Sequence, residues 1–381
     1  MKEGWWDLIG TIKKFREELE KPFIGRGEES LIITLGLITS EHVILVGEPG
    51  TAKSALARRA ADLINARFFK YLLTKYTEPD ELLGPLDIKS FKEGRYVRIT
   101  RGKLPEAEIA FLDEIFNASS AILNTLLSLM NERVIYDGYC EISVPLWTLI
   151  AASNNVPEEP EYNALYDRFL IRHFVKPVSE DKWLELLEAS WKIEREGYRA
   201  PSSVLTIDNL KEINNVLYTV DLSRIKHKLI KLFAVLEDQG IHLTDRRKGK
   251  ALKVLAAHAL LNGRREVLEE DLAVLKYIAS SSREDQDKIY FILLEEIGTR
   301  DRILNDLLEI ENNMKEVKVY LVKSVDFDPR LLEYLRGLEK AREKIKKIIE
   351  STIDDQVKSK AISVLSDIEH LIENIRGRLL L

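Results

Sequence analysis

The sequence predicts an α/β fold with a parallel sheet, followed by a smaller all-α domain and a C-terminal region of three helices. Short, nearly all-apolar runs alternate with helical patterns as far as Pro177, as expected for strands that are buried on both faces of a sheet. From Val204 to Ser282 apolar residues recur only at three- and four-residue spacing, which is typical of helices. The last hundred residues again show only a helical pattern.

The expected strands of the core share a short, nearly all-apolar composition: His42–Gly47, Glu108–Asp113 and Leu146–Ser153. Helical patterns over Ser54–Ile64 and Ala121–Val134 lie between them. A connecting helix is expected over Glu180–Tyr198, because Gly197 and Pro201 would close it.

The C-terminal region carries three apolar stripes at helical spacing: Leu307, Ile310, Met314 and Val317; Leu331, Leu335, Leu338, Ile345 and Ile349; and Val357, Ala361, Val364, Ile368, Leu371 and Ile375. Pro329 and the Asp354–Asp355 pair are the expected breaks between them. An internally packed bundle is the favoured interpretation, and a surface that docks a partner is the alternative. We therefore expect four parts: an α/β core with an N-terminal helix and an insert (1–177), a connecting helix (178–203), an all-α domain (204–282) and a helical bundle (283–381).

Composition excludes several classes of protein. The 381 residues carry a net charge of -6, which argues against a general nucleic-acid-coating protein. Cys140 is the single cysteine, so neither an intrachain disulfide nor a cysteine metal cluster is possible, and the six histidines show no metal-ligand spacing. The N-terminus lacks the apolar core of a signal peptide, and no apolar run approaches the ~18 residues of a membrane span. We expect a cytoplasmic protein.

A nucleotide-binding loop is expected after the first strand. GEPGTAKS fits G-x-x-x-x-G-K-[ST] except that Ala52 replaces Gly. Its backbone N–H groups would bind the β-phosphate of ATP, Lys53 would reach the β- and γ-phosphates, and Ser54 would hold Mg²⁺. The alternative, a turn that only caps a helix, loses weight in this strand–loop–helix context. The predicted binding segment is Gly47, Glu48, Pro49, Gly50, Thr51, Ala52, Lys53, Ser54 and Ala55.

A second motif predicts hydrolysis. Asp113 and Glu114 end an apolar strand about 60 residues after the loop, the arrangement called Walker B. Asp113 would bind the Mg²⁺ shell, and Glu114 would orient or deprotonate the attacking water. The alternative role for these two acids is to cap a helix N-terminus.

These residues resemble the MoxR branch of the AAA+ family and, within it, the RavA-like members. GEPGTAKS has the small residue in place of Gly that is familiar in RavA-like loops. Tyr76–Glu114 is similar to that group's helix-2 insert leading into Walker B, and Ala121–Gly138 and Ala164–Arg172 are similar to its following segments. The resemblance covers roughly Phe23 to Gly263 and implies an AAA+ P-loop core followed by an all-α lid.

The resemblance also assigns roles to single residues. Asn154 matches sensor 1, a polar group near the γ-phosphate, although an Asn in a strand-to-loop turn is common. Arg168 matches the arginine finger that completes a neighbouring subunit's site; Arg172 is the runner-up, and a surface salt bridge is the alternative for either. In many MoxR proteins Asn-Arg follows the Walker B Glu-Ile, whereas Phe116-Asn117 stand here, so the resemblance assigns no intersubunit arginine at this position.

Two further assignments follow from the resemblance. Arg246 matches sensor 2, through which the lid would sense the nucleotide; Arg247 is the adjacent candidate, and a charged helix start capped by Asp245 is the alternative. Phe23, Ile24 and Gly25 match the segment that usually contacts adenine, and a loop entering a helix is the simpler interpretation.

The implied function is an ATP-hydrolysing, magnesium-dependent ring motor, hexameric by resemblance, that remodels or matures protein complexes as a chaperone-like enzyme. The family also implies a protein client and a partner with a von Willebrand factor A domain. The hairpin expected near Val134–Val144 and the insert, whose segment Asp87–Ile99 would line a pore or lie on the surface, are candidates for passing motion to the client. A motor acting on nucleic acid and a nucleotide-dependent scaffold without turnover are the rival functions.

Overall fold

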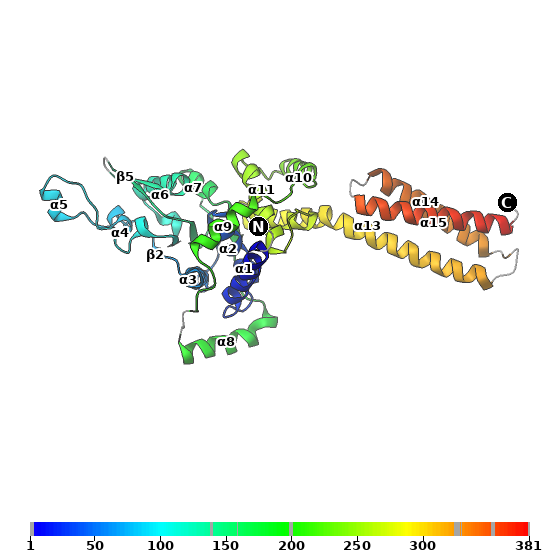
Figure 1. The fold of residues 1–381 in the computed structure, drawn as a ribbon, viewed down its shortest axis with the longest axis horizontal. Helices are drawn as coiled ribbons and strands as arrows, with labels where there is room; N and C mark the ends of the chain where they lie inside the picture. Colours follow the sequence, from blue (N-terminus) through cyan, green and yellow to red (C-terminus); the bar gives the residue numbers. More distant parts are fainter. Residues whose placement is uncertain are drawn as a thin grey trace. The chain divides into compact units, whose positions relative to one another are not determined.

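The computed structural model describes residues 4–137, 140–157, 159–197, 201–323, 328, 330–351 and 355–379. The chain divides into two compact units, Met1–Phe291 and Ile292–Leu381. The first contains a sheet with helices on both of its faces and a set of helices beside it (Figure 1).

A five-stranded parallel sheet forms the centre of the first unit, in the order β2-β3-β6-β1-β7. Its strands are β1 (Val43–Val46), β2 (Phe68–Leu72), β3 (Ile109–Asp113), β6 (Thr148–Ser153) and β7 (Ile171–Phe174). The three expected strands are confirmed as β1, β3 and β6, which lie side by side. β2 and β7 are additional: β2 is an edge strand with partly exposed residues, and β7 buries Arg172 and His173, so neither forms an all-apolar run.

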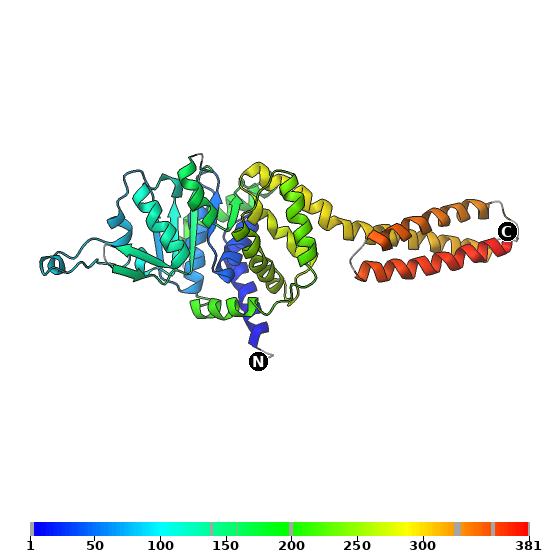
Figure 2. The same cartoon turned by 90° about the horizontal axis from the view of Figure 1, so that it is seen from above.

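Helices cover both faces of this sheet (Figure 2). They are α1 (Gly4–Glu20), α2 (Gly27–Thr39), α3 (Lys53–Ile64), α6 (Ser120–Glu132) and α7 (Asn163–Arg168), with the 3₁₀ turns η1 (Leu104–Glu106), η2 (Ile115–Asn117) and η3 (Pro160–Tyr162). α3 and α6 confirm the two helices expected between the strands. Their apolar residues pack with those of the sheet in one core that includes Leu112, Leu126 and Phe169.

Two segments extend from the core. Between β2 and β3 lie α4 (Pro79–Leu83) and α5 (Ile88–Lys92), and the chain on either side of α5 pairs antiparallel at Leu86 and Arg98. The expected hairpin after α6 is confirmed as β4 (Val134–Asp137) and β5 (Cys140–Ser143). Its turn at Gly138 lies outside the described residues.

The connecting helix is confirmed as α8 (Trp183–Glu196), which follows η4 (Glu180–Lys182). The helical region after it contains α9 (Ile207–Leu217), α10 (Lys226–Asp238), α11 (Asp245–Leu261), η5 (Glu269–Val274) and α12 (Leu275–Ala279). Buried Asp271 joins two of these elements, because it pairs with His258 of α11 at 2.6 Å and with Arg264 at 2.7 Å.

The C-terminal region contains three helices, α13 (Arg283–Lys323), α14 (Arg330–Ser351) and α15 (Asp355–Leu379). α13 begins in the first unit and continues into the second. The three apolar stripes pack against one another, which confirms an internally packed bundle. Of the expected breaks, Pro329 and Asp354 lie outside the described residues, and α15 begins at Asp355. In the described part of the chain, each helix is too short or too polar to cross a membrane.

Candidate active site

The parallel sheet brings the sequence motifs together. β3, β6 and β1 are neighbours, so Asp113-Glu114, Asn154 and the loop that begins at Gly47 all follow the carboxyl ends of adjacent strands. The Gly47 N–H donates to the carbonyl of Ser153 at 2.9 Å, which joins the loop to the strand before Asn154. Ligands of open α/β sheets bind at this edge.

The loop from Gly47 to Ala52 has a backbone that favours residues without bulky side chains. A Cβ at Gly47 would lie 2.8 Å from the Val175 carbonyl oxygen, so the position requires glycine. Gly50 and Ala52 both have left-handed backbones, with φ of 84° and 63°. For Ala52 this conformation costs about 1–2 kcal/mol. Replacing Gly by Ala at this position therefore has a cost in backbone conformation.

Lys53 begins α3 and is buried. Its Nζ donates to the carbonyl oxygens of Gly47 at 2.6 Å and Glu48 at 2.8 Å. Burial lowers the pKa of Lys53, while the nearby carboxylates of Asp113 and Glu114 act in the opposite direction. A buried ammonium group at a helix N-terminus, held by two loop carbonyls and by the Thr51 hydroxyl at 3.4 Å, fits the phosphates of a nucleotide.

The oxygen donors of a magnesium site are also present. Ser54 is the second residue of α3, and Asp113 is the last residue of β3. Both side chains are partly buried, and a hydroxyl with a carboxylate is a ligand pair that Mg²⁺ takes when it is also bound to phosphates.

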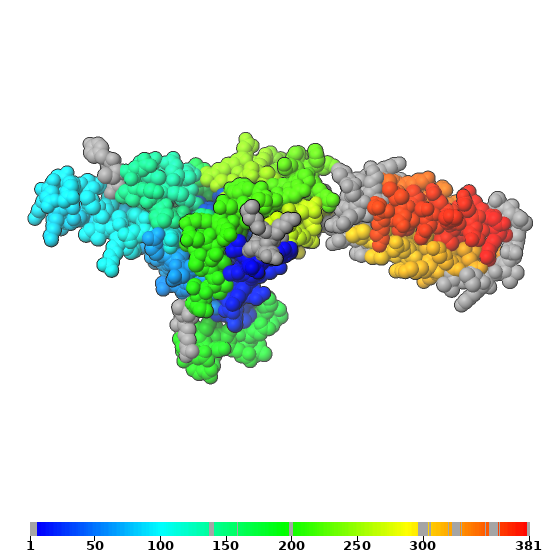
Figure 3. Space-filling model, in the orientation of Figure 1, coloured from blue at the N-terminus to red at the C-terminus, as the bar shows by residue number. Residues whose placement is uncertain are grey.

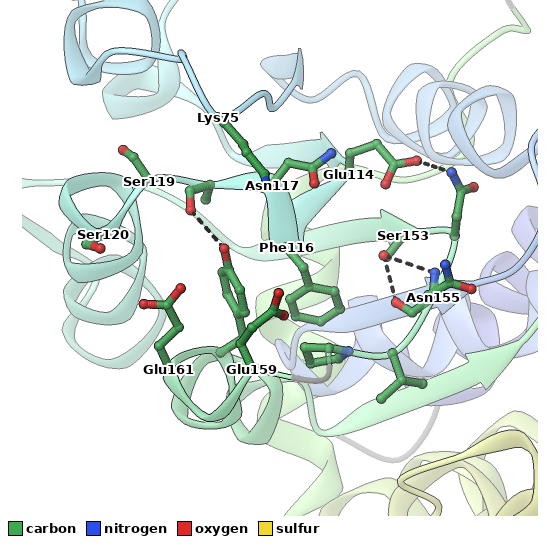
Figure 4. A pocket seen from close by; sticks show the side chains of 15 residues that line it. Lys75, Glu114, Phe116, Asn117, Ser119, Ser120, Ser153, Asn155, Glu159 and Glu161 are labelled. Carbon is green, nitrogen blue, oxygen red and sulfur yellow. Dashed lines mark hydrogen bonds between the residues drawn. The ribbon is translucent and has the colours of Figure 1, made fainter.

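Glu114 is held in a strained conformation beside Asn154. Its backbone is left-handed, with φ of 51°, and such strain of non-Gly residues is concentrated at functional sites. Asn154 Nδ2 donates to Glu114 Oε1 at 2.5 Å (Figure 4). The Glu114 side chain forms no hydrogen bond that caps η2, so the helix-capping alternative is wrong for this residue.

A cavity of about 620 Å³ opens beside Glu114 and Asn154. Its wall includes Lys75 and also Phe116 and Asn117, the two residues that replace the family's Asn-Arg (Figure 4). Phe116 packs edge-on against Tyr162 and Tyr166, so this residue has an apolar packing role.

Arg168 is the last residue of α7, and its side chain is more exposed and has fewer bonding partners than that of Arg172. Arg168 Nη1 lies 3.7 Å from Asp167 Oδ2, its side chain is 26% exposed, and its buried Nε has no hydrogen-bond partner in the described part of the chain. Arg172 is buried and donates to the carbonyls of Tyr166 and Phe169 and, through Nη1, to the Ser280 carbonyl and Ser281 Oγ. Arg172 therefore joins the core to the helices after α11.

The structure also separates Arg246 from Arg247. Arg247 is buried, its guanidinium donates to the carbonyls of Phe169, Leu170 and Ile278, and burial lowers its pKa to about 9. Arg246 is partly exposed and donates to Asn131 Oδ1 at 3.2 Å. Burial lowers the pKa of Arg246, and the charge of nearby Arg168 lowers it further.

The alternative of a charged helix start capped by Asp245 is wrong in two respects. The N-cap of α11 is Thr244, whose Oγ1 accepts a hydrogen bond from the Arg247 N–H. The two arginines are also not equivalent solvated cations, because the guanidinium of Arg247 is buried.

The expected adenine segment lies between α1 and α2. Phe23 and Ile24 are partly buried, and Gly25 has φ of 71°. A Cβ at Gly25 would contact Val178, and both residues line a cavity of about 190 Å³ that also includes Pro177 and Lys182. The segment thus faces the chain that leaves β7.

Sequence reasoning missed two residues that hold the arginines. Asp167 pairs with Arg168 and accepts from Thr244 Oγ1 at 3.3 Å. Asn131, near the end of α6, holds Arg246. The acid directly before Arg168 in LYDRF was a visible signal for the first, whereas nothing in the sequence indicates the second.

Comparison with known proteins defines the family. Residues 10–215 match the family described as the MoxR domain of MoxR–vWA–β-propeller ternary systems, and residues 218–293 match an AAA lid domain. The chain belongs to the MoxR family of AAA+ ATPases. The α/β core is thus an AAA+ core, and α10 to α12, which lie within residues 218–293, belong to its lid.

Individual relatives agree with this family. An uncharacterized protein of Methanocaldococcus jannaschii is 40% identical over 81% of this chain and 82% of its own length. The chaperone MoxR1 of Mycobacterium tuberculosis is 24% identical over 81% and 83% of the two chains. The crystal structure of a candidate ATPase from Cytophaga hutchinsonii shares the fold, with a TM-score of 0.65 over 77% of this chain and 96% of that one, at 20% identity.

Proposed function

We propose that this MoxR ATPase hydrolyses ATP in a site completed by a neighbouring copy. The convergence of Lys53, Glu114 and Asn154 at one edge of the sheet carries the proposal. Tyr162, just before α7, lines the cavity beside Glu114, whereas Arg168 lies at the other end of that helix. Six residues at 1.5 Å each place Arg168 roughly 9 Å further along, and the family resemblance assigns an arginine at this position to a neighbouring subunit's site.

Each residue then has one task. Lys53 and the N–H groups of the loop bind the phosphates, while Ser54 and Asp113 would hold Mg²⁺, which would neutralise charge on the phosphate oxygens. Glu114, oriented by Asn154, accepts the proton of the attacking water. The neighbour's Arg168 stabilises the charge of the transition state.

Arg246 is proposed as a second cation supplied by the same neighbour. It lies close enough to Arg168 for their charges to repel, and a bound phosphate would add to the relief that Asp167 already gives. Asn131 and Asp167 hold the two side chains in place. Loss of Arg246 is then expected to lower kcat in the same assay as loss of Arg168.

A mixing experiment tests this arrangement. Lys53→Ala should abolish nucleotide binding, Glu114→Gln should retain binding without turnover, and Arg168→Ala should bind nucleotide but hydrolyse it at least 100-fold more slowly. Equal amounts of Lys53→Ala and Arg168→Ala should recover part of the wild-type rate, because a subunit with an intact site meets a neighbour with an intact finger. Arg58→Ala, which removes an exposed ion-paired arginine, is the matched control and should leave the rate unchanged. Unchanged turnover in Arg168→Ala contradicts the proposal.

We further propose a hexameric ring that remodels protein complexes in the cytoplasm and works with a von Willebrand factor A domain protein. The matching family is defined by systems that contain such a partner, and MoxR1 carries the name of a chaperone. A pull-down with Glu114→Gln in ATP should capture that partner and the protein client. The RavA-like assignment stays a prediction.

A further inference from the structure

The segment Gly84–Lys103 between α4 and η1, called the arm below, projects from the first unit (Figure 3). Its base is closely packed. Gly84 has φ of 97°, and a Cβ there would lie 2.1 Å from the Ile99 carbonyl oxygen, so only glycine fits. The Asp87 N–H donates to the Val97 carbonyl, and the Ile99 N–H to the Pro85 carbonyl, both at 2.8 Å.

Arg98 locks the two sides of the arm together. Its side chain is almost completely buried, and Nη1 donates to the Gly84 carbonyl at 2.7 Å and to Asp80 Oδ1 at 2.5 Å. Lys103 Nζ adds a bond to the Glu81 carbonyl at 2.9 Å. The arm is therefore a fixed structure at its base.

The tip of the arm is also ordered by local bonds. Asp87 caps α5 by accepting from the Lys89 N–H and from Ser90 Oγ, the latter at 2.7 Å. The Arg95 N–H then closes the turn on the Ser90 carbonyl at 2.8 Å, with Gly94 at φ of 77°. A preformed tip of this kind lowers the entropy cost of binding a partner.

The arm exposes apolar side chains that the protein itself does not cover. The exposed fractions are 69% for Ile88, 60% for Phe91, 51% for Ile99, 44% for Val97 and 40% for Tyr96. Apolar side chains that are grouped on a rigid segment and bordered by charges mark interaction surfaces.

The arm is basic, whereas the chain as a whole is acidic. Between Asp87 and Lys103 it carries six cations and two carboxylates, in a protein whose net charge is -6. Lys89, Lys92 and Arg101 are all exposed, and they lie among the exposed apolar residues. A complementary partner must therefore carry both acidic and apolar groups.

We propose that the arm binds an extended polypeptide segment in which acidic residues alternate with apolar ones. Nucleic acid is the less suitable occupant, because only two of the five exposed apolar side chains, Phe91 and Tyr96, carry a ring that could stack on bases, whereas the aliphatic majority fits apolar side chains of a polypeptide. This inference deepens the proposed function, since it names the class of client on which the motor acts, and it rests on that function.

Binding is tested with reduced, carboxymethylated α-lactalbumin, an unfolded acidic polypeptide, labelled for fluorescence anisotropy with the full-length protein. Phe91→Ser/Lys92→Glu changes an exposed pair on the arm. Ile230→Ser/Lys231→Glu changes an equally exposed pair on α10 and serves as the matched control. We expect the arm variant to bind at least tenfold more weakly and the control to bind as the wild type does, with affinity falling as salt increases.

Equal binding by the arm variant and the wild type overturns the proposal. Tighter binding of a 20-nucleotide oligo(dT) than of the polypeptide overturns it as well. ATP hydrolysis without client is measured for the same proteins and should be equal in all three. An inactive wild type that still binds the polypeptide through the arm would refute the proposed function alone. An active wild type with arm-independent binding would refute the inference alone.

Discussion

The Asn154–Glu114 hydrogen bond predicts a specific kinetic defect in Asn154→Ala. Asn154 Nδ2 donates to Glu114 Oε1 at 2.5 Å, and Glu114 is already confined by its left-handed backbone. Removing the amide leaves the carboxylate without the group that fixes its orientation towards the attacking water. The defect should therefore appear in the chemical step.

The size of the defect follows from the kind of bond. Hydrogen bonds to a charged group contribute about 1.5–3 kcal/mol. Asn154 is exposed and Glu114 is only partly buried, so water can replace part of the interaction and the lower end of the range applies. About 1.5 kcal/mol corresponds to a decrease in kcat of roughly tenfold.

The assay compares steady-state ATP hydrolysis with the affinity for a fluorescent ADP analogue. We expect kcat to fall about tenfold while the Kd changes less than twofold, because Lys53 and the loop are intact. Asn155→Ala is the matched control, since Asn155 lines the same cavity but does not bond to Glu114. A fall in kcat of equal size in both variants, or a weakened Kd with unchanged kcat, would refute the orienting role of Asn154.

Three further predictions concern stability, measured by urea unfolding with tryptophan fluorescence, because all five tryptophans lie in the first unit. Ala52→Gly should stabilise the protein by about 1 kcal/mol, because it removes left-handed strain and only part of the gain is lost to the freer unfolded chain. Arg247→Met should destabilise it by at least about 3 kcal/mol, because three buried backbone carbonyls lose their charged donor at about 1–3 kcal/mol each. Burial, reinforced by the charge of Arg133, lowers the pKa of His42 well below its usual range, so the folded protein keeps this histidine neutral. Below about pH 6.5 the unfolded chain binds the proton, so stability is complete above that pH and should fall by about 1.4 kcal/mol between pH 7.5 and 5.5.

Each of these predictions has a matched comparison. Asn65→Gly should gain less than Ala52→Gly, because asparagine tolerates a left-handed backbone; an equal gain would argue against strain at Ala52. Arg246→Met should cost less than about 1 kcal/mol, and a loss as large as that of Arg247→Met would contradict the different burial of the two residues. In His42→Asn the change in stability with pH should shrink by about 1.4 kcal/mol; an unchanged pH dependence would exclude His42 as its source.

Local patterns were sufficient to predict much of the core. β1, β3 and β6 are buried on both faces, so their sequences are apolar throughout and visible without other information. β7 was not visible in this way, because Arg172 and His173 become buried only when residues near Ser280 and Glu29 supply hydrogen-bond and ionic partners. The arm's short helix was equally hidden, since five residues capped by Asp87 leave no periodic pattern.

The residues of the candidate site also fall into two groups, those that local sequence indicated and those that depend on tertiary packing. The phosphate loop and the Walker B acids are contiguous in sequence, so a strand and the turn after it determine their local geometry, and the residues themselves indicated their chemistry. The sequence did not indicate which of the candidate arginines are buried. Arg168 and Arg172 are four residues apart, and Arg246 and Arg247 are neighbours, yet one member of each pair is buried against backbone carbonyls from distant elements.

The sequence by itself therefore determined the family, the strand–loop–helix that would hold ATP and the carboxylates that would act on it. Only the tertiary structure decided that the charges of Arg168 and Arg246 interact, that Asn154 holds Glu114 and that the arm is a rigid, basic and partly apolar surface. The physical reason is that burial and charge at a side chain depend on residues brought together by folding, which no short stretch of sequence records.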